Sequence, residues 1–108
     1  MALETTPAGI GRHIHGMLEK TALERSKFLA KTMPDIPPII ARKEEGAEST
    51  EIVICHPSQS GTNDLYRIRI CMQSGNITTP DNTVLPLSDY SVAFGRAHRA
   101  IINYARPA

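Results

Sequence analysis

Histidine and cysteine are the residues of this sequence whose side chains most often carry chemistry. His13 and His15 lie two apart in a segment of helical periodicity, so their side chains point about 200° apart and cannot bind one metal ion together. Cys55 and His56 are neighbours in a predicted strand and point to opposite faces. Cys71 lies about six residues further along the next strand, too far from Cys55 for a disulfide or a shared metal ion. We therefore predict no metal site and no cofactor.

An enzymatic role would need His56 or His98 to lie in a pocket beside a carboxylate or a thiol. The sequence places no such group next to either imidazole. We therefore predict a non-enzymatic protein with no catalytic residues, and we infer no small-molecule ligand.

Five arginines form two groups that could contact phosphates. Arg67 and Arg69 alternate outward on a predicted strand, whereas Arg96, Arg99 and Arg106 share one side of the last predicted helix. The chain has 12 basic and 11 acidic residues, a net charge of +1. Because strongly electrostatic nucleic-acid binders are usually basic overall, this balance makes RNA binding the second hypothesis, not the first.

Arg25 is unusual because its helical angle places it inside the apolar band of the first predicted helix. A helix of about 24 residues would be about 36 Å long, which exceeds the width of a domain of this size. Its apolar face should then extend beyond its own sheet. We therefore expect Ile10, Ile14, Met17 and Arg25 to form an interface with a protein partner or a second copy of the chain.

The first helix is expected to run from about Ile10 to the residue before Pro34. Thr5 or Thr6 is the candidate cap, and residues 1–8 are expected to be a flexible start. Three prolines within residues 34–38 predict an extended connection to an edge strand that begins at Ile39.

Two clear strands follow, at residues 51–55 and 65–72. If their core faces coincide, Ile52 pairs with Ile68, Ile54 pairs with Tyr66, and Glu51 lies opposite Arg69. We expect loops at residues 44–50, 56–64 and 74–86, with residues 83–85 as a candidate short strand.

The last helix is expected to begin at Ser88 as its cap and to end at Pro107. The whole chain, residues 1–108, is thus predicted to be a single α+β domain. It is a two-layer sandwich with a long N-terminal helix, an antiparallel meander of about three strands and a C-terminal helix, both helices covering one face. This order is similar to that of double-stranded RNA-binding domains, although the Lys-rich helix start expected there is absent.

The first residues contain no apolar run of the kind found in signal peptides, and no segment has the length of a membrane span. We expect a cytoplasmic, intracellular protein with reduced thiols and no membrane partner. The first hypothesis is a protein-interaction or assembly module, a homodimer or other homo-oligomer, that associates through its N-terminal helix or a sheet edge. The alternative is an RNA-binding module that uses the outward arginines.

Overall fold

Helix α1 (Pro7–Thr32) begins at Thr6, whose side-chain oxygen accepts a hydrogen bond from the Gly9 N–H at 3.1 Å. Pro7 occupies the first helical turn, where its missing N–H costs nothing. In this computed structural model residues 6–58 and 61–104 are described. The flexible start predicted for residues 1–8 is wrong for residues 7 and 8, which are helical, and its first five residues lie outside the described part of the chain.

The sheet contains five antiparallel strands, in chain order from one edge to the other. They are β1 (Ile40–Glu45), β2 (Ser49–Ser58), β3 (Gly61–Cys71), β4 (Ile77–Thr78) and β5 (Val84–Leu85). The predicted α+β class is confirmed, but the sheet has five strands where about three were expected. The two additional short strands lie within the predicted polar loop at residues 74–86, where residues 84 and 85 fall on the candidate short strand.

The pairing of β2 with β3 confirms the predicted register. Ile52 lies opposite Ile68, Ile54 opposite Tyr66, and Glu51 opposite Arg69. The core formed on this face is aliphatic, and Ile52, Ile54, Ile68 and Ile70 are each at most 1% exposed.

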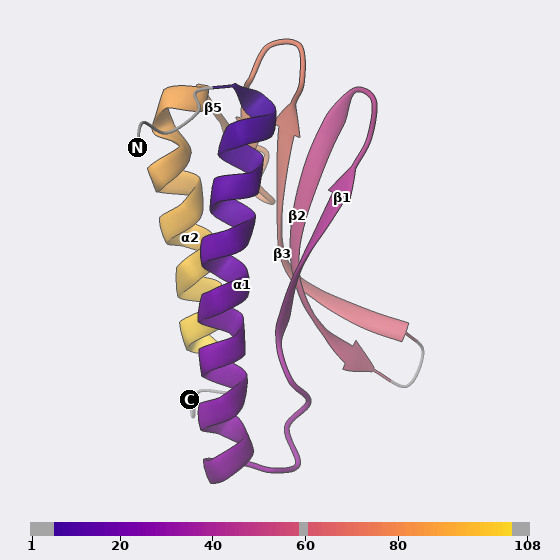
Figure 1. The fold of residues 1–108 in the computed structure, drawn as a ribbon, viewed down its shortest axis with the longest axis vertical. Helices are drawn as coiled ribbons and strands as arrows, with labels where there is room; N and C mark the ends of the chain where they lie inside the picture. The colour runs from indigo at the N-terminus through magenta and orange to yellow at the C-terminus, as the bar shows by residue number, and fades with distance from the viewer. Residues whose placement is uncertain (1–5, 59–60, 105–108) are drawn as a thin grey trace.

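The loop predicted at residues 56–64 is wrong, because most of these residues continue the two strands. After a register shift between Ile54 and Cys55, Cys55 pairs with Asp64 and Pro57 with Thr62. We call this extension, Cys55–Ser58 with Gly61–Asp64, the hairpin arm; it diverges from the helices (Figure 1). Pro57 is tolerated there because β1 pairs with β2 only as far as Cys55.

Helix α2 (Tyr90–Asn103) follows a 3₁₀ turn at Leu87–Asp89. The prediction of Ser88 as its cap is wrong, since Ser88 lies inside that turn and Asp89 precedes the helix without a side-chain capping bond. The helix ends at Asn103, with Tyr104 as its C-cap, and Pro107 lies outside the described residues.

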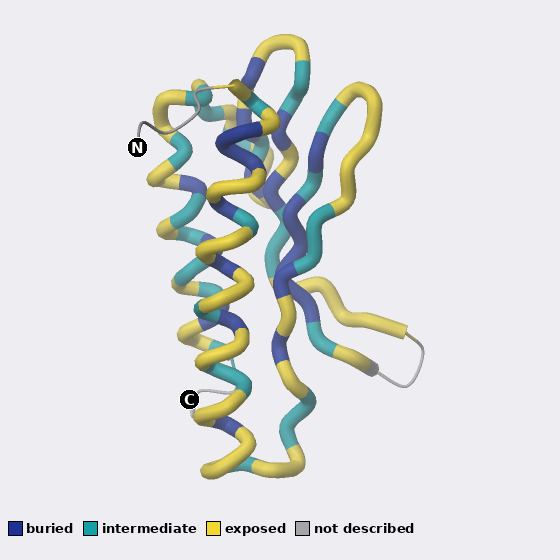
Figure 2. Tube along the Cα trace, viewed as in Figure 1, coloured by how far each residue is buried: buried dark blue, intermediate teal, exposed yellow. Residues whose placement is uncertain are grey.

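The two helices lie side by side on one face of the sheet and run in the same direction (Figure 1). Between the layers lie the buried residues of both helices and the inner face of the sheet (Figure 2). A Cβ at Gly11 would lie 3.6 Å from Ile70 Cδ1, which is ordinary van der Waals contact, so this part of α1 packs directly on the sheet. Among the described helices, none is both long enough and apolar enough to cross a membrane.

Candidate functional site

Part of strand β3 has no neighbour on the side opposite β2. Strand β4 pairs with it only at Arg69 and Ile70. The chain then turns away, since the Thr79 N–H donates to the Thr83 carbonyl at 3.0 Å and the next residue, Pro80, has no N–H. Within the described chain, residues 61–68 of β3 therefore form an open strand edge.

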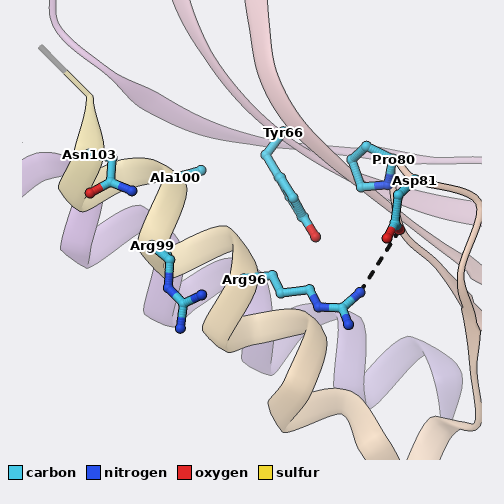
Figure 3. A pocket seen from close by; sticks show the side chains of 7 residues that line it. All are labelled: Tyr66, Pro80, Asp81, Arg96, Arg99, Ala100 and Asn103. Carbon is cyan, nitrogen blue, oxygen red and sulfur yellow. Dashed lines mark ion pairs between the residues drawn. The ribbon is translucent and has the colours of Figure 1, made fainter. Parts of the chain in front are cut away.

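A hollow of about 360 Å³ lies on the helix side of this open edge (Figure 3). Its lining combines one β3 side chain with the β4–β5 turn and one side of α2. These residues are Tyr66, Pro80, Asp81, Arg96, Arg99, Ala100 and Asn103. The Tyr66 ring stands between the turn and the helix, and Arg96 reaches from α2 toward Asp81 (Figure 3). The hollow thus presents basic and amide groups beside an exposed strand.

The charges of this helix-side hollow are only partly compensated. Arg96 Nη1 lies 3.9 Å from Asp81 Oδ1, and their side chains are 40% and 66% exposed, so the attraction is weak. Asp81 accepts hydrogen bonds from the Thr79 hydroxyl and the Thr83 N–H, which lower the pKa of its carboxyl. Arg99 is exposed and forms no ion pair with any described residue.

Burial raises the pKa of Tyr66, and the nearby Arg96 guanidinium opposes that rise. The phenol is therefore neutral near neutral pH. A neutral hydroxyl in this position can donate a hydrogen bond to a carboxylate or a carbonyl oxygen.

A second hollow, also about 360 Å³, lies on the other face of the sheet beside the same edge. It is lined by Arg67, Arg69, Thr78, Thr79, Pro80 and Asn82. Its arginines are already paired. Arg67 donates to Glu51 at 2.5 Å and to Asp64 at 2.6 Å, and Arg69 Nε donates to Glu51 at 3.0 Å.

Glu51 is the centre of this ion-pair network, and its side chain is only 16% exposed. Burial opposes ionisation of Glu51, but the guanidinium groups of Arg69 and Arg67 outweigh it and lower the pKa of the carboxyl. The Glu51 carboxylate therefore stays ionised at neutral pH between two arginines.

The arginines predicted to contact nucleic acid differ in whether acidic side chains already pair with them closely. Arg67 and Arg69 face outward as predicted but are neutralised by acidic neighbours. Arg96 and Arg99 lie together in the helix-side hollow, and Arg106 lies outside the described residues.

Sequence reasoning missed Tyr66, Pro80 and Asp81 as members of a site. The only available signal was the Thr-Pro-Asp-Asn run of residues 79–82, which is typical of a turn and says nothing of what the turn stands beside.

The predicted helix interface is largely occupied by the chain itself. Ile10 and Ile14 are 2% and 0% exposed within the core, so they offer no surface to a partner. Met17 is 43% exposed. Arg25 is held locally, because its Nη2 donates to the Tyr104 carbonyl at 2.9 Å and its guanidinium lies over the Phe28 ring. The sheet already covers the helix surface that was expected to be in excess around Ile10 and Ile14.

The histidines take part in packing contacts. His15 Nε2 lies 3.0 Å from the Ala41 carbonyl, and the His13, His56 and His98 rings contact Tyr90, Tyr104 and Phe94. Both cysteines are free thiols. Among the described residues, no three acidic, histidine or cysteine side chains gather closely enough to hold a metal ion.

Comparison with known proteins found no matching family model, no similar curated protein and no similar solved structure.

Proposed function

We propose that this chain is a protein-interaction module that binds an extended segment of its partner as an additional strand along the open edge of β3. In this mode of recognition, backbone hydrogen bonds supply affinity and hollows for alternate side chains supply specificity. The observation that carries the proposal is that unpaired backbone and side-chain hollows occur together on strand β3. Among the described residues, none pairs with residues 61–68 on the side opposite β2, and a hollow lies on each face of the sheet, beside Tyr66 on one face and Arg67 on the other.

The other sheet edges are poorer candidates. Strand β5 has only two residues, and short edge strands resist pairing. Strand β1 carries charged side chains that are paired along the strand, with Arg42 bonded to Glu44 at 2.6 Å and Lys43 to Glu45 at 3.0 Å. Charged edges of this kind are typical of strands that are protected against association.

The first step of the test selects binders from a displayed library of random twelve-residue peptides on the 108-residue chain. Amide hydrogen exchange is then measured with and without a selected peptide. We expect slower exchange at every second residue of 61–68, because alternate N–H groups of an antiparallel strand point to the same side. Protection confined to another part of the chain, or no binder at all, would contradict strand addition.

Two proline variants sharpen this test. Successive N–H groups in β3 point to opposite sides, so Thr62→Pro and Asn63→Pro each remove a different one. The variant that removes an N–H on the open edge should fold normally and bind the peptide more weakly. The other should destabilise the arm, because it removes a bond to β2. Exchange rates in the free protein identify which is which, since the bonded amide exchanges more slowly.

Nucleic-acid binding through Arg96 and Arg99 is the second candidate, because Arg99 is exposed and unpaired among the described residues. Two arginine contacts would give an affinity that falls only modestly with salt, with a slope of log K on log salt of about −2. A gel-shift with a short RNA duplex and a single strand at low salt tests this. No retardation would dispose of the hypothesis.

The proposal includes the expected intracellular location, since free thiols at Cys55 and Cys71 suit a reducing compartment.

A further inference from the structure

We infer that the segment added to β3 is acidic, with carboxylates at every second residue facing Arg96 and Arg99. This inference rests on the proposed strand addition and specifies the chemistry of the partner. Its ground is the difference in charge between the two hollows that flank the open edge.

An added strand would present its side chains alternately to the two faces of the sheet. Where the added strand passes Tyr66 and Arg67, its side chains would meet α2 and the helix-side hollow on one face and the hollow beside Arg67 and Arg69 on the other. Residues two apart in a strand are about 6.6 Å apart. Residues three apart on a helix have Cβ atoms about 5–6 Å apart. Two carboxylates at alternate positions can therefore reach Arg96 and Arg99 together.

In the hollow beside Arg67 and Arg69, acidic side chains of the chain itself already balance the positive charge. Arg67 and Arg69 are matched there by Glu51 and Asp64, at distances of 2.5–3.0 Å. Uncharged polar residues are the best fit for the alternate positions that face it, next to Thr78 and Asn82.

In the helix-side hollow, the positive charge is not balanced. Its two arginines face one carboxylate, Asp81, which is already hydrogen-bonded within its own turn and lies 3.9 Å from Arg96. Carboxylates beside Arg96 and Arg99 would form charge-assisted, bidentate hydrogen bonds. The Tyr66 hydroxyl adds a neutral donor at the same place.

A second copy of this chain fits the edge less well. Two β3 strands paired antiparallel would share a face residue by residue, so both α2 helices would lie on the same side of the joined sheet. Arg96 and Arg99 of each copy would then approach those of the other. Like charges placed together disfavour association, so the charge pattern selects a different, acidic partner.

Three twelve-residue probe peptides test the inference. One alternates threonine with glutamate, one alternates threonine with lysine, and one contains the same glutamates in a single block. Affinities are measured by fluorescence anisotropy at two salt concentrations. We expect the alternating acidic peptide to bind about ten-fold or more tightly than the other two, equivalent to about 1.4 kcal/mol, and to weaken with salt.

A charge-reversed double variant, Arg96→Glu with Arg99→Glu, should reverse the preference and bind the lysine peptide more tightly. The matched control is Lys20→Glu with Lys27→Glu. It changes the net charge equally at exposed positions of α1 and should leave the preference unchanged. Circular dichroism and thermal melting check that both variants fold.

Each other outcome is decisive. Equal binding of the acidic and lysine peptides, with protection of the β3 edge, would overturn the acidic preference and leave strand addition standing. Tight self-association with a protected β3 edge would identify a second copy as the occupant and overturn it too. Failure of the probes and of the random library would remove both proposals. RNA binding lost in the Arg96→Glu/Arg99→Glu variant, without peptide binding, would assign the hollow to nucleic acid.

Discussion

Glu51 holds two arginines at once, and the free energy of that arrangement depends on its ionisation. Its side chain is mostly buried and accepts hydrogen bonds from Arg67 and Arg69. Replacement by Gln keeps the shape but removes the charge that both guanidinium groups face. Hydrogen bonds to charged groups contribute about 1.5–3 kcal/mol, and the partial exposure of both arginines reduces this. We expect Glu51→Gln to lower the free energy of unfolding by about 1–2 kcal/mol at pH 7.

The same variant carries a pH signature. Because the folded-state pKa of Glu51 lies below its ordinary value of 4.5, its contribution to stability is present above that value. It is lost as the pH falls through the folded-state pKa. Urea unfolding should therefore separate wild type and Glu51→Gln at pH 7 and bring them together at low pH. Glu48→Gln, at an exposed position in the β1–β2 connection, is the control. Two results would contradict the stabilising role of the Glu51 charge. One is a loss of unfolding free energy in Glu48→Gln as large as that in Glu51→Gln. The other is a difference between wild type and Glu51→Gln that persists at low pH.

The fate of the arginines shows what residue-level reasoning could and could not reach. Strand alternation predicted that Arg67 and Arg69 would face outward, and the register predicted Glu51 opposite Arg69. The pairing of Arg67 with Asp64 was not predictable, because it depends on the register shift between Ile54 and Cys55. A bulge changes which side chains share a face, and no local pattern marks this one.

Ser26 connects two elements of the fold. Its hydroxyl donates to the Ile39 carbonyl and accepts from the Ile39 N–H, both at 2.9 Å, and so fixes the entry to β1 against α1. Loss of the hydroxyl would leave two backbone groups of a buried residue without partners. Each such group costs about 1–3 kcal/mol, partly offset by the better helix propensity of alanine, about 0.5 kcal/mol.

We therefore expect Ser26→Ala to lower the free energy of unfolding by at least about 1.5 kcal/mol, measured by urea denaturation. Ser91→Ala makes the same substitution at an exposed position of α2. It should be neutral or slightly stabilising. Equal effects of the two substitutions would mean that the hydrogen bonds between Ser26 and Ile39 contribute nothing to stability.

The elements divide into those set by local pattern and those set by pairing. Apolar periodicity was sufficient for α1 and for the paired cores of β2 and β3, because burial of one face requires it. The hairpin arm carries polar residues and turn-forming types such as Pro57 and Asn63, and β4 is only two residues long. They become strands only because a neighbour supplies backbone hydrogen bonds. Strand preference of this kind depends on context and is weakly encoded locally.

At the scale of the whole molecule, the two layers leave one face of the sheet without helices (Figure 1). Val53 is nevertheless fully buried on that face. Its lateral neighbours in register are Arg42 and Arg67, whose long aliphatic stems can cover it. The ion pairs hold these arginines in place, and the arginine stems cover the apolar surface of Val53. The helix-free face can therefore be charged while Val53 beneath it stays buried.

The part of the sheet packed under the helices, here called the body, is expected to be locally more stable than the hairpin arm. Ile68 and Ile70 are fully buried under the helices, whereas residues 61–65 of the same strand are exposed (Figure 2). Backbone hydrogen bonds with few buried apolar contacts open locally, without global unfolding. We expect amides of the arm to exchange through openings that depend little on urea. The amides of Ile68 and Ile70 should require global unfolding.

Native-state hydrogen exchange at increasing urea concentrations measures this difference residue by residue. A common urea dependence for the arm and the body would show that they unfold as one unit. A locally labile edge has a consequence for binding, since a segment that is ordered by its partner gives up conformational entropy and lowers the net affinity. Binding at the β3 edge should then move the arm amides toward the slow exchange of the body, and the size of that shift measures how much order the added strand imposes.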